Sequence, residues 1–293
     1  MTDNGSVVSI IGFGEAGASL CLGWNRRCVR GFDIKLKRAQ TRKAILAAMK
    51  KLSVNATKDA ATAVRNADLI FSTVTADQAF SAASSVVPGL KPGALFFDLN
   101  SCAPTTKLES EAVIEAAGGR YVDVAVMATI TPHYHKTPML ICGKHSDDAM
   151  TALQALDMKP TLVPGPVGRA STIKMLRSVL MKGVEALTFE CFFAASKAGL
   201  INEVANSLDA SQTKLGWKDQ ASYTCECMTT HGIRRAAEMR EVVKTLSSLG
   251  ISAEMTRGTV RRQQELGQLR VSLNDFDSCD AHIAALEKAL SKS

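Results

Sequence analysis

A glycine-rich turn that directly follows a short apolar run is the feature that most constrains the fold of this chain. Residues 7–11 read Val-Val-Ser-Ile-Ile, which is typical of a buried parallel strand. The residues that follow are Gly12, Phe13, Gly14, Glu15, Ala16 and Gly17. In this spacing, the first glycine permits a tight turn, the second lets the backbone approach a pyrophosphate, and the third lets a helix pack closely on the strand. The motif therefore predicts a βαβ unit whose helix N-terminus binds a dinucleotide.

An acidic residue at the end of the next strand-like run indicates which dinucleotide is bound. Asp33 follows the run Val29–Phe32, one βαβ unit after the glycine motif. A carboxylate at this point accepts hydrogen bonds from the adenosine ribose hydroxyls and repels a 2′-phosphate, which favours NAD. The basic residues Lys35, Lys37 and Arg38 follow directly, and they could hold that phosphate. We therefore predict NAD as the cofactor, with NADP as the alternative.

The composition places the chain among soluble globular proteins. With 293 residues, of which 46% are hydrophobic and 22% charged, it is long enough for one large domain or two ordinary domains with buried cores. The net charge of +7 could suggest nucleic acid, but the basic residues are dispersed and only 5% of the residues are aromatic. No window reaches the apolar length of a membrane span. We therefore expect a small anionic substrate as the partner, and neither nucleic acid nor a membrane.

The eight cysteines indicate the compartment. They are scattered without the spacing of a disulfide framework, and most lie in apolar segments, as reduced thiols of a cytoplasmic protein do. The closest pair, Cys225 and Cys227, has no second pair nearby and does not form a metal-binding pattern. We predict a cytoplasmic protein with no metal site.

The first half of the chain alternates strand and helix patterns. Apolar strands are expected at 7–11, 29–32, 69–73, 95–99, 121–126, 138–142 and 161–163. Helical periodicity lies between them, at 38–52, 76–86 and 106–117. Such alternation predicts an α/β fold with a Rossmann-like, doubly wound parallel sheet that helices cover on both faces.

The pattern changes at the Pro-Gly-rich segment 164–168, after which the chain reads as helix throughout. Helices are expected at 169–198, 234–249, 256–270 and 280–291. We therefore predict a dinucleotide-binding Rossmann domain over 1–164 and an all-α domain for substrate binding and dimerisation over 165–293. The ligand crevice would lie at the carboxyl ends of the strands, roofed by the second domain.

The loops at the carboxyl ends of the strands supply the candidate ligand-binding residues. Those expected to contact the cofactor are Thr73, Val74, Thr75 and Asn100. Those expected to contact the substrate are Ser101, Met127, Thr129 and His133. His135 lies on the same loop, and either histidine could bind substrate or assist proton transfer near neutral pH. A surface-loop position away from any ligand is the alternative for each histidine.

Lys174 is the candidate for proton transfer. It lies near the start of the long helix, whose first turns would face the crevice because the chain has just left the sheet. In a closed, partly apolar cleft a lysine has a lowered pKa, so it can exchange a proton with a substrate hydroxyl. Arg177, Ser178 and Lys182 lie on or beside the same helix face and are expected to contact the substrate. On spacing alone, a solvated helix lysine is the alternative.

Gly165-x-x-Gly168-x5-Lys174 resembles the catalytic-helix motif of the β-hydroxyacid dehydrogenases, which include 6-phosphogluconate and 3-hydroxyisobutyrate dehydrogenases. Other segments are similar to this family in the same order over nearly the whole chain. Residues 11–17 resemble its cofactor fingerprint, 98–101 the segment beside the nicotinamide, and 121–126 the strand that leads to its substrate loop. The resemblance implies that Lys174 is the general acid/base.

The chain departs from this family at the substrate-binding residues. Where the family has Ser-Gly-Gly to hold a substrate carboxylate, this chain has Met127-Ala128-Thr129, and Ser178 replaces the family's asparagine. Residues 174–183 and 234–239 resemble a divergent, phosphogluconate-dehydrogenase-like branch that includes sugar-acid oxidoreductases or oxidoisomerases. In the second segment, Arg234 and Arg235 fall where the family places a basic residue near the ligand, although ordinary helix solvation explains both.

We therefore expect an NAD(P)-dependent dehydrogenase that removes hydride from the CH–OH carbon of a small β-hydroxy acid or sugar acid while Lys174 takes the proton. One alternative is NADPH-dependent reduction of a C=N bond, since enzymes of that kind share the architecture but commonly lack the helix lysine. Another is a non-catalytic nicotinamide-responsive sensor, which has no need of Lys174. The long helix 169–198 can bury more apolar surface than one small domain covers, so we also expect a homodimer through the helical domain.

Overall fold

The computed structural model describes residues 6–24, 29–211, 216–273 and 277–292 of the chain. It divides into two compact units, residues 1–179 and 180–293. The division falls inside the long helix α8 (Arg169–Ala198), whereas the sequence analysis placed it in the loop before this helix. The first turns of α8 belong to the sheet-containing unit because the Asp123 carboxylate accepts hydrogen bonds from the amides of Gly168 and Ser171. Within the described ranges, no helix combines the length and apolar character that a membrane span requires.

The first unit is built on one sheet of eight strands in the order β3-β2-β1-β4-β5-β6-β7-β8. The strands are β1 (Val8–Ile11), β2 (Val29–Phe32), β3 (Val54–Ala56), β4 (Leu69–Ser72), β5 (Leu95–Asp98), β6 (Arg120–Val126), β7 (Pro138–Cys142) and β8 (Lys159–Leu162). The first six are parallel, which confirms the predicted Rossmann-like class. The expectation of an all-parallel sheet was wrong at its end, where β7 pairs antiparallel with β6 and β8 runs parallel to β7.

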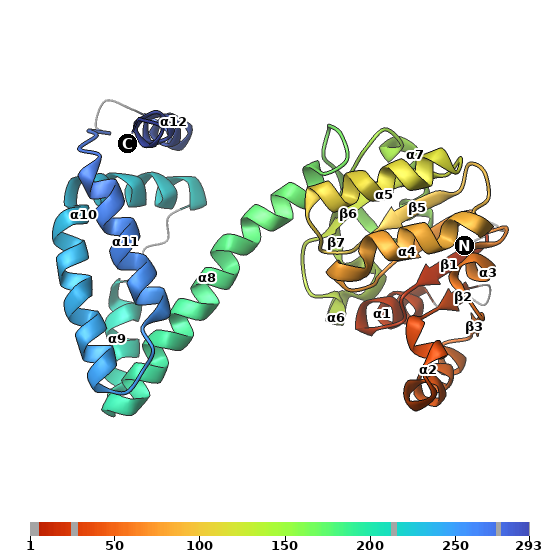
Figure 1. The fold of residues 1–293 in the computed structure, drawn as a ribbon, viewed down its shortest axis with the longest axis horizontal. Helices are drawn as coiled ribbons and strands as arrows, with labels where there is room; N and C mark the ends of the chain where they lie inside the picture. Colours follow the sequence, from red (N-terminus) through yellow and green to blue (C-terminus); the bar gives the residue numbers. More distant parts are fainter. Residues whose placement is uncertain (1–5, 25–28, 212–215, 274–276, 293) are drawn as a thin grey trace. The chain divides into compact units, whose positions relative to one another are not determined.

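Two layers of helices cover this sheet. They are α1 (Glu15–Trp24), α2 (Ala39–Lys51), α3 (Ala60–Val64), α4 (Ala79–Val86), α5 (Pro104–Ala116), α6 (Ile130–His133) and α7 (Ser146–Ala155). Figure 1 shows α4, α5 and α7 over one face of the sheet and α1 over the other. Because both faces are covered, every residue of β1, β4 and β5 is buried. The rings of Phe71 and Phe97 stack in this core with their centroids 4.7 Å apart.

The second unit is helical, as predicted. After α8 come α9 (Ile201–Ser211), α10 (Trp217–Ser248), α11 (Glu254–Gln268) and α12 (Cys279–Leu290). The predicted helix 234–249 is the second half of α10, and α9 was not predicted. The helices α10 and α11 cross at Gly232 and Gly267, where a Cβ atom on Gly232 would lie 2.3 Å from the Gln263 carbonyl oxygen. The imidazole of the buried His282 in α12 lies 2.8 Å from the Ser222 hydroxyl of α10.

Candidate active site

The glycine loop forms a tightly packed turn that is open at its middle glycine. Gly12 has a φ of +91°, and a Cβ atom there would lie 2.5 Å from the Thr73 carbonyl oxygen. A Cβ atom on Gly17 would lie 2.3 Å from the Gly12 carbonyl oxygen, so α1 packs directly on the turn. Around Gly14, by contrast, a Cβ atom would meet nothing within 4 Å. This open backbone before the N-terminus of α1 fits a pyrophosphate group.

Asp33, at the end of β2, holds the glycine loop through its carboxylate. Its buried carboxylate accepts a hydrogen bond from the Phe13 amide at 2.7 Å and one from the Lys35 amide at 2.8 Å. The second bond caps a short 3₁₀ helix (Ile34–Lys37), which contains the basic residues Lys35 and Lys37. The Lys37 ammonium lies 5.5 Å from the centroid of the Phe32 ring. The glycine loop and the end of β2 are therefore one rigid element, and a carboxylate at this point fits an adenosine ribose.

Asn100 connects the ends of β4 and β5. The side-chain amide of this buried residue donates to the Ser72 hydroxyl at 2.9 Å and accepts from the Val74 amide at 2.7 Å. The Thr73 hydroxyl in turn donates to the Gly12 carbonyl at 2.7 Å. Four predicted cofactor-binding positions, Gly12, Thr73, Val74 and Asn100, are thus brought together at the carboxyl edge of the sheet. Thr75 is exposed and precedes a 3₁₀ turn.

Lys174 lies in the second turn of α8, within the first unit, and its side chain is partly buried. Burial lowers the pKa of its amine to about 8, and the positive charges of Lys107 and Arg177 act in the same direction. An amine with such a pKa exchanges protons readily near neutral pH. This partial burial favours the proton-transfer prediction over the solvated-lysine alternative.

The other residues nominated for substrate contact have diverse surroundings. Ser178 is partly buried, and its hydroxyl donates to the Lys174 carbonyl at 2.9 Å along the helix. Arg177 is exposed, and the Lys182 side chain lies outside the described part of the chain. Met127 packs with Ala125, Cys142 and Ala170, the last of which belongs to the first turn of α8.

The remaining candidates lie on the loops after β5 and β6 and on helix α10. Ser101, on the loop after β5, is exposed, as are Thr129 and His133 on α6 or just before it. His135 is partly buried against α1, and burial lowers the pKa of its imidazole although the Asp157 carboxylate opposes this effect. Arg234 and Arg235 lie on α10 in the second unit.

Sequence reasoning missed a buried charge cluster beside Lys174. The Lys107 side chain of α5 is fully buried, and its ammonium lies 3.0 Å from an Asp98 carboxylate oxygen and 3.4 Å from an Asp123 carboxylate oxygen. The Tyr121 hydroxyl donates to the second Asp98 oxygen at 2.7 Å. The available signal was one aspartate within each apolar run, Asp98 after Phe97 in β5 and Asp123 between two valines in β6, because buried carboxylates require a cation or several donors. No three His, Cys, Asp or Glu side chains of the described residues are grouped as metal ligands.

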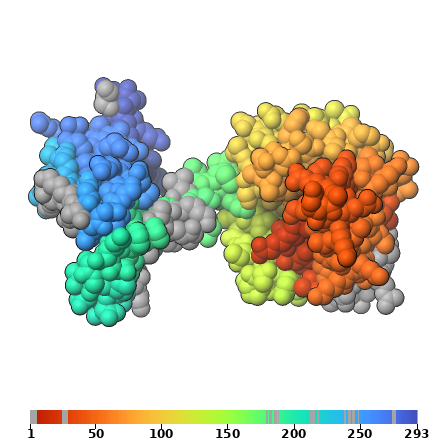
Figure 2. Space-filling view, turned by 60° about the horizontal axis from the view of Figure 1, so that its bottom comes forward, coloured from red at the N-terminus to blue at the C-terminus, as the bar shows by residue number. Residues whose placement is uncertain are grey.

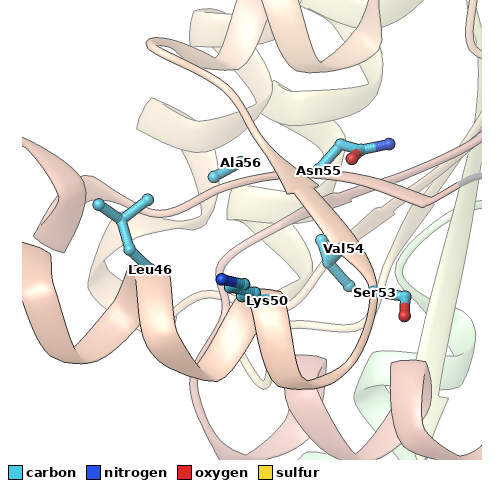
Figure 3. Close-up of a pocket in the computed structure, with 6 residues that line it drawn as sticks. All are labelled: Leu46, Lys50, Ser53, Val54, Asn55 and Ala56. Carbon is cyan, nitrogen blue, oxygen red and sulfur yellow. The ribbon is translucent and has the colours of Figure 1, made fainter.

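A separate open pocket lies at the outer edge of the sheet. Its lining comes from α2 and from β3 with the preceding turn: Leu46, Lys50, Ser53, Val54, Asn55 and Ala56. Figure 3 shows Leu46 and Lys50 rising from the helix toward the strand. This segment forms much of the face of the first unit that Figure 2 shows in orange. Because β3 is two strands away from β1 in the sheet order, the pocket is not part of the site at the glycine loop.

Comparisons with known families agree with this geometry. Residues 7–157 match the family model described as the NAD binding domain of 6-phosphogluconate dehydrogenase. Residues 195–266 match the family model described as a domain of unknown function, DUF1932. The two matches fall in the first and the second unit, respectively.

Solved structures resemble the chain over most of its length. A conserved hypothetical protein from Sinorhizobium meliloti is 31% identical, with 97% of this chain and 96% of that chain covered and a TM-score of 0.59. A second conserved protein, described as structurally similar to 3-hydroxyacid dehydrogenases, is 25% identical over 90% of this chain and 98% of its own, with a TM-score of 0.55. An imine reductase from Myxococcus stipitatus in complex with NADP+ shares the fold at 16% identity, covering 95% and 98% of the two chains with a TM-score of 0.71.

Proposed function

Because the chain belongs to the family of the NAD binding domain of 6-phosphogluconate dehydrogenase, we propose that it is an NAD(P)-dependent oxidoreductase acting on a CH–OH group. Its substrate is a small β-hydroxy acid or sugar acid, and Lys174 is the general acid/base. The observation that carries this proposal is the partly buried Lys174 amine with a pKa of about 8 on a helix whose start is bonded to the sheet. A permanently charged surface lysine could not take up a proton near neutral pH.

The cofactor and the reacting proton are assigned to different residues. The backbone from Gly12 to Gly17 would hold the pyrophosphate, and Asp33 the adenosine ribose. When bound, the nicotinamide supplies the acceptor for hydride. The neutral Lys174 amine accepts the proton of the substrate hydroxyl as hydride leaves the carbon that bears this hydroxyl. The resulting Lys174 ammonium stabilises negative charge on the substrate oxygen. In the reverse reduction, the Lys174 ammonium donates that proton.

The substrate is proposed to be an anion. The net charge of +7 and the Arg177 guanidinium near Lys174 favour a carboxylate or phosphate in the crevice. Ser101, Thr129, His133, Ser178 and Lys182 remain proposed substrate contacts. The buried Asp33 carboxylate supports NAD over NADP, because a 2′-phosphate beside it would be repelled.

Reduction of a C=N bond is a second candidate function. It is favoured by Met127, which stands where the resembling dehydrogenases have a carboxylate-binding serine and which packs in an apolar cluster. An apolar side chain at that point suits an uncharged amine or imine better than an anion. The Lys174 amine argues against this candidate, since hydride transfer to a protonated imine needs no lysine.

Turnover assays distinguish these functions. Nicotinamide reduction is measured with β-hydroxy acids, aldonates and aryl hydroxy acids, with NAD and NADP side by side, and imine reduction is measured with NADPH. We expect oxidation of one hydroxy acid class and a loss of about a hundredfold or more in Lys174→Ala. The matched control is Lys91→Ala, because this exposed lysine precedes β5 at the opposite edge of the sheet. Imine reduction that survives Lys174→Ala, without hydroxy acid turnover, would replace the proposal by the second candidate.

A homodimer through the helical unit is also proposed. The described part of α8 exposes Leu180, Val184, Leu187, Phe189 and Phe193, with 69% of the Phe189 surface accessible. Leu180, Val184 and Leu187 share one face of the helix, and the stacked rings of Phe189 and Phe193 lie on the opposite face. Both faces therefore offer apolar surface to a partner chain. On α9, which follows α8 in the chain, Leu208 is also exposed. A monomer of one chain mass at micromolar concentration in sedimentation would contradict the dimer, and Phe189→Ser should weaken it while Leu22→Ser in α1 should not.

A cytoplasmic location completes the proposal. The seven cysteines of the described ranges carry free thiols, of which Cys21, Cys102 and Cys142 are buried. Burial raises the pKa of the Cys21 thiol to about 12, which keeps it protonated and unreactive. Protected thiols of this kind suit a reducing compartment.

A further inference from the structure

The fully buried Lys107 side chain is not explained by the fold alone. Its ammonium donates to the Asp98 carbonyl oxygen at 2.6 Å and pairs with the carboxylates of Asp98 and Asp123. Removing three charged groups from water costs several kcal/mol for each ion, and apolar residues of the same volume often stabilise a core at least as well. The stability of the core therefore does not by itself account for the buried cluster of Lys107, Asp98 and Asp123.

One member of the cluster also holds the start of α8. An Asp123 carboxylate oxygen accepts hydrogen bonds from the Gly168 amide at 3.0 Å and from the Ser171 amide at 3.2 Å. The other oxygen accepts from the Ser171 hydroxyl at 2.6 Å. Amides in the first turn of a helix have no partner within the helix, so this carboxylate fixes where α8 begins. Lys174 follows Ser171 by three residues, which is less than one further turn.

From these contacts we propose that Lys107 is a positioning residue for Lys174. Its ammonium holds Asp98 at the end of β5 and Asp123 in β6, and Asp123 holds the first turn of α8, so the Lys174 amine is fixed relative to the carboxyl edge of the sheet. This role rests on the proposed function of Lys174 as the acid/base. The chain of contacts joins β5, α5 and β6 to α8, where Ser171 lies 48 residues after Asp123.

The same geometry has an electrostatic consequence. The charges that act on Lys174 are those of Lys107 from α5 and Arg177 from α8, and after burial the Lys107 charge is the larger cause of the lowered pKa. Lys107 itself faces Asp98 from β5, Asp123 and Tyr121 from β6, and Cys102 from the loop after β5. Burial lowers the pKa of Lys107, but the two carboxylates outweigh burial and keep it charged. A neutral side chain at 107 would leave these carboxylates uncompensated, so the pKa of Lys174 would rise.

The test measures Lys174 directly. Acetic anhydride labelling of the full-length protein across pH, read by peptide mass spectrometry, gives the pH at which the Lys174 amine becomes reactive. We expect half-maximal reactivity near pH 8 in the unaltered protein, and a rise of about one pH unit in Lys107→Met. Lys107→Arg, which keeps the charge, and the surface variant Lys91→Met should leave the midpoint in place. A folded Lys107→Met with an unchanged midpoint would overturn the proposal.

If Lys107→Met does not fold, a double variant tests the same proposal. Lys107→Met combined with Asp98→Asn removes one charge of each sign and leaves Asp123 as the remaining carboxylate of the pair. Amide hydrogen exchange of the peptide 165–175 should be faster in this double variant than in the unaltered protein, because the start of α8 is no longer anchored through Lys107. Unchanged exchange would contradict the positioning role. Neither measurement requires turnover, so an absence of dehydrogenase activity would refute the proposed function without deciding this one.

Discussion

Each unit contains a carboxylate that caps a distant helix, and the two carboxylates have different surroundings. In the first unit, Asp123 caps α8 and lies beside the Lys107 ammonium. In the second, the buried Glu190 of α8 caps α11 by accepting from the amides of Met255 and Thr256, both at 3.0 Å. Burial raises the pKa of Glu190, but these hydrogen bonds and that of the Thr256 hydroxyl outweigh it and hold the pKa below its ordinary value.

The lysine beside Asp123 serves a purpose other than capping a helix. The environment of Glu190 indicates that hydrogen-bond donors are enough to keep such a carboxylate ionised. The lysine beside Asp123 is therefore not required for capping. It lies instead where its charge acts on Lys174, and perturbed ionisable groups of this kind gather at functional sites. The comparison predicts that altering the two caps will have unequal effects.

The largest effect is expected from Asp123→Asn. The asparagine oxygen can still accept from the Gly168 and Ser171 amides, but without a charge, and the asparagine NH2 group replaces the oxygen that faces the Ser171 hydroxyl and the Lys107 ammonium. Lys107 is then left with one buried counter-charge. We expect the free energy of unfolding of the first unit to fall by about 3 kcal/mol, as for other broken buried ion pairs. Fluorescence of Trp24 during urea unfolding reports this unit when Trp217 is replaced by Phe. A loss below about 1 kcal/mol would show that the cap and the ion pair contribute little.

The pH dependence of turnover should be the next largest effect. Oxidation requires the neutral Lys174 amine, so kcat/KM should rise about tenfold per pH unit up to about pH 8 and then level. Reduction requires the ammonium, so its rate should be level below about pH 8 and fall above it. Lys107→Met should move both limbs to higher pH. Profiles without a limb between pH 7 and 9 in either direction would contradict the role of Lys174.

The sequence predicted the parts of the fold that local patterns determine. The glycine loop, the central strands and α8 follow from short apolar runs, turn residues and helical periodicity. The strand β3 was missed because it has three residues, of which only Val54 is buried. The direction of β7 was missed because an apolar run is the same in either direction, although the short connection over 127–137 favours an antiparallel pair.

The candidate site could be predicted only in part, for a related reason. Lys174 and the glycine loop are recognised from spacing along the chain. Lys107 lies on a helix and, from its neighbours in the sequence, is expected to be solvated. Its burial depends on carboxylates from β5 and β6, which only the folded sheet brings within 3.4 Å. Contacts between distant segments leave no periodic signal in a single sequence.

The smallest effect is expected from Glu190→Gln. The neutral side chain keeps part of the cap, so the second unit should lose about 1 kcal/mol of unfolding free energy, as for other helix caps. Because the pKa of Glu190 is lowered by folding, its contribution is present above its unfolded pKa of about 4 and is lost as pH falls through the folded value. The difference between the variant and the unaltered protein should therefore vanish in acid. Faster hydrogen exchange over 253–258 at pH 7, with an unchanged Lys174 labelling midpoint, is the expected outcome. A shifted midpoint would mean that the two caps are coupled and that the lysine beside Asp123 does not distinguish them.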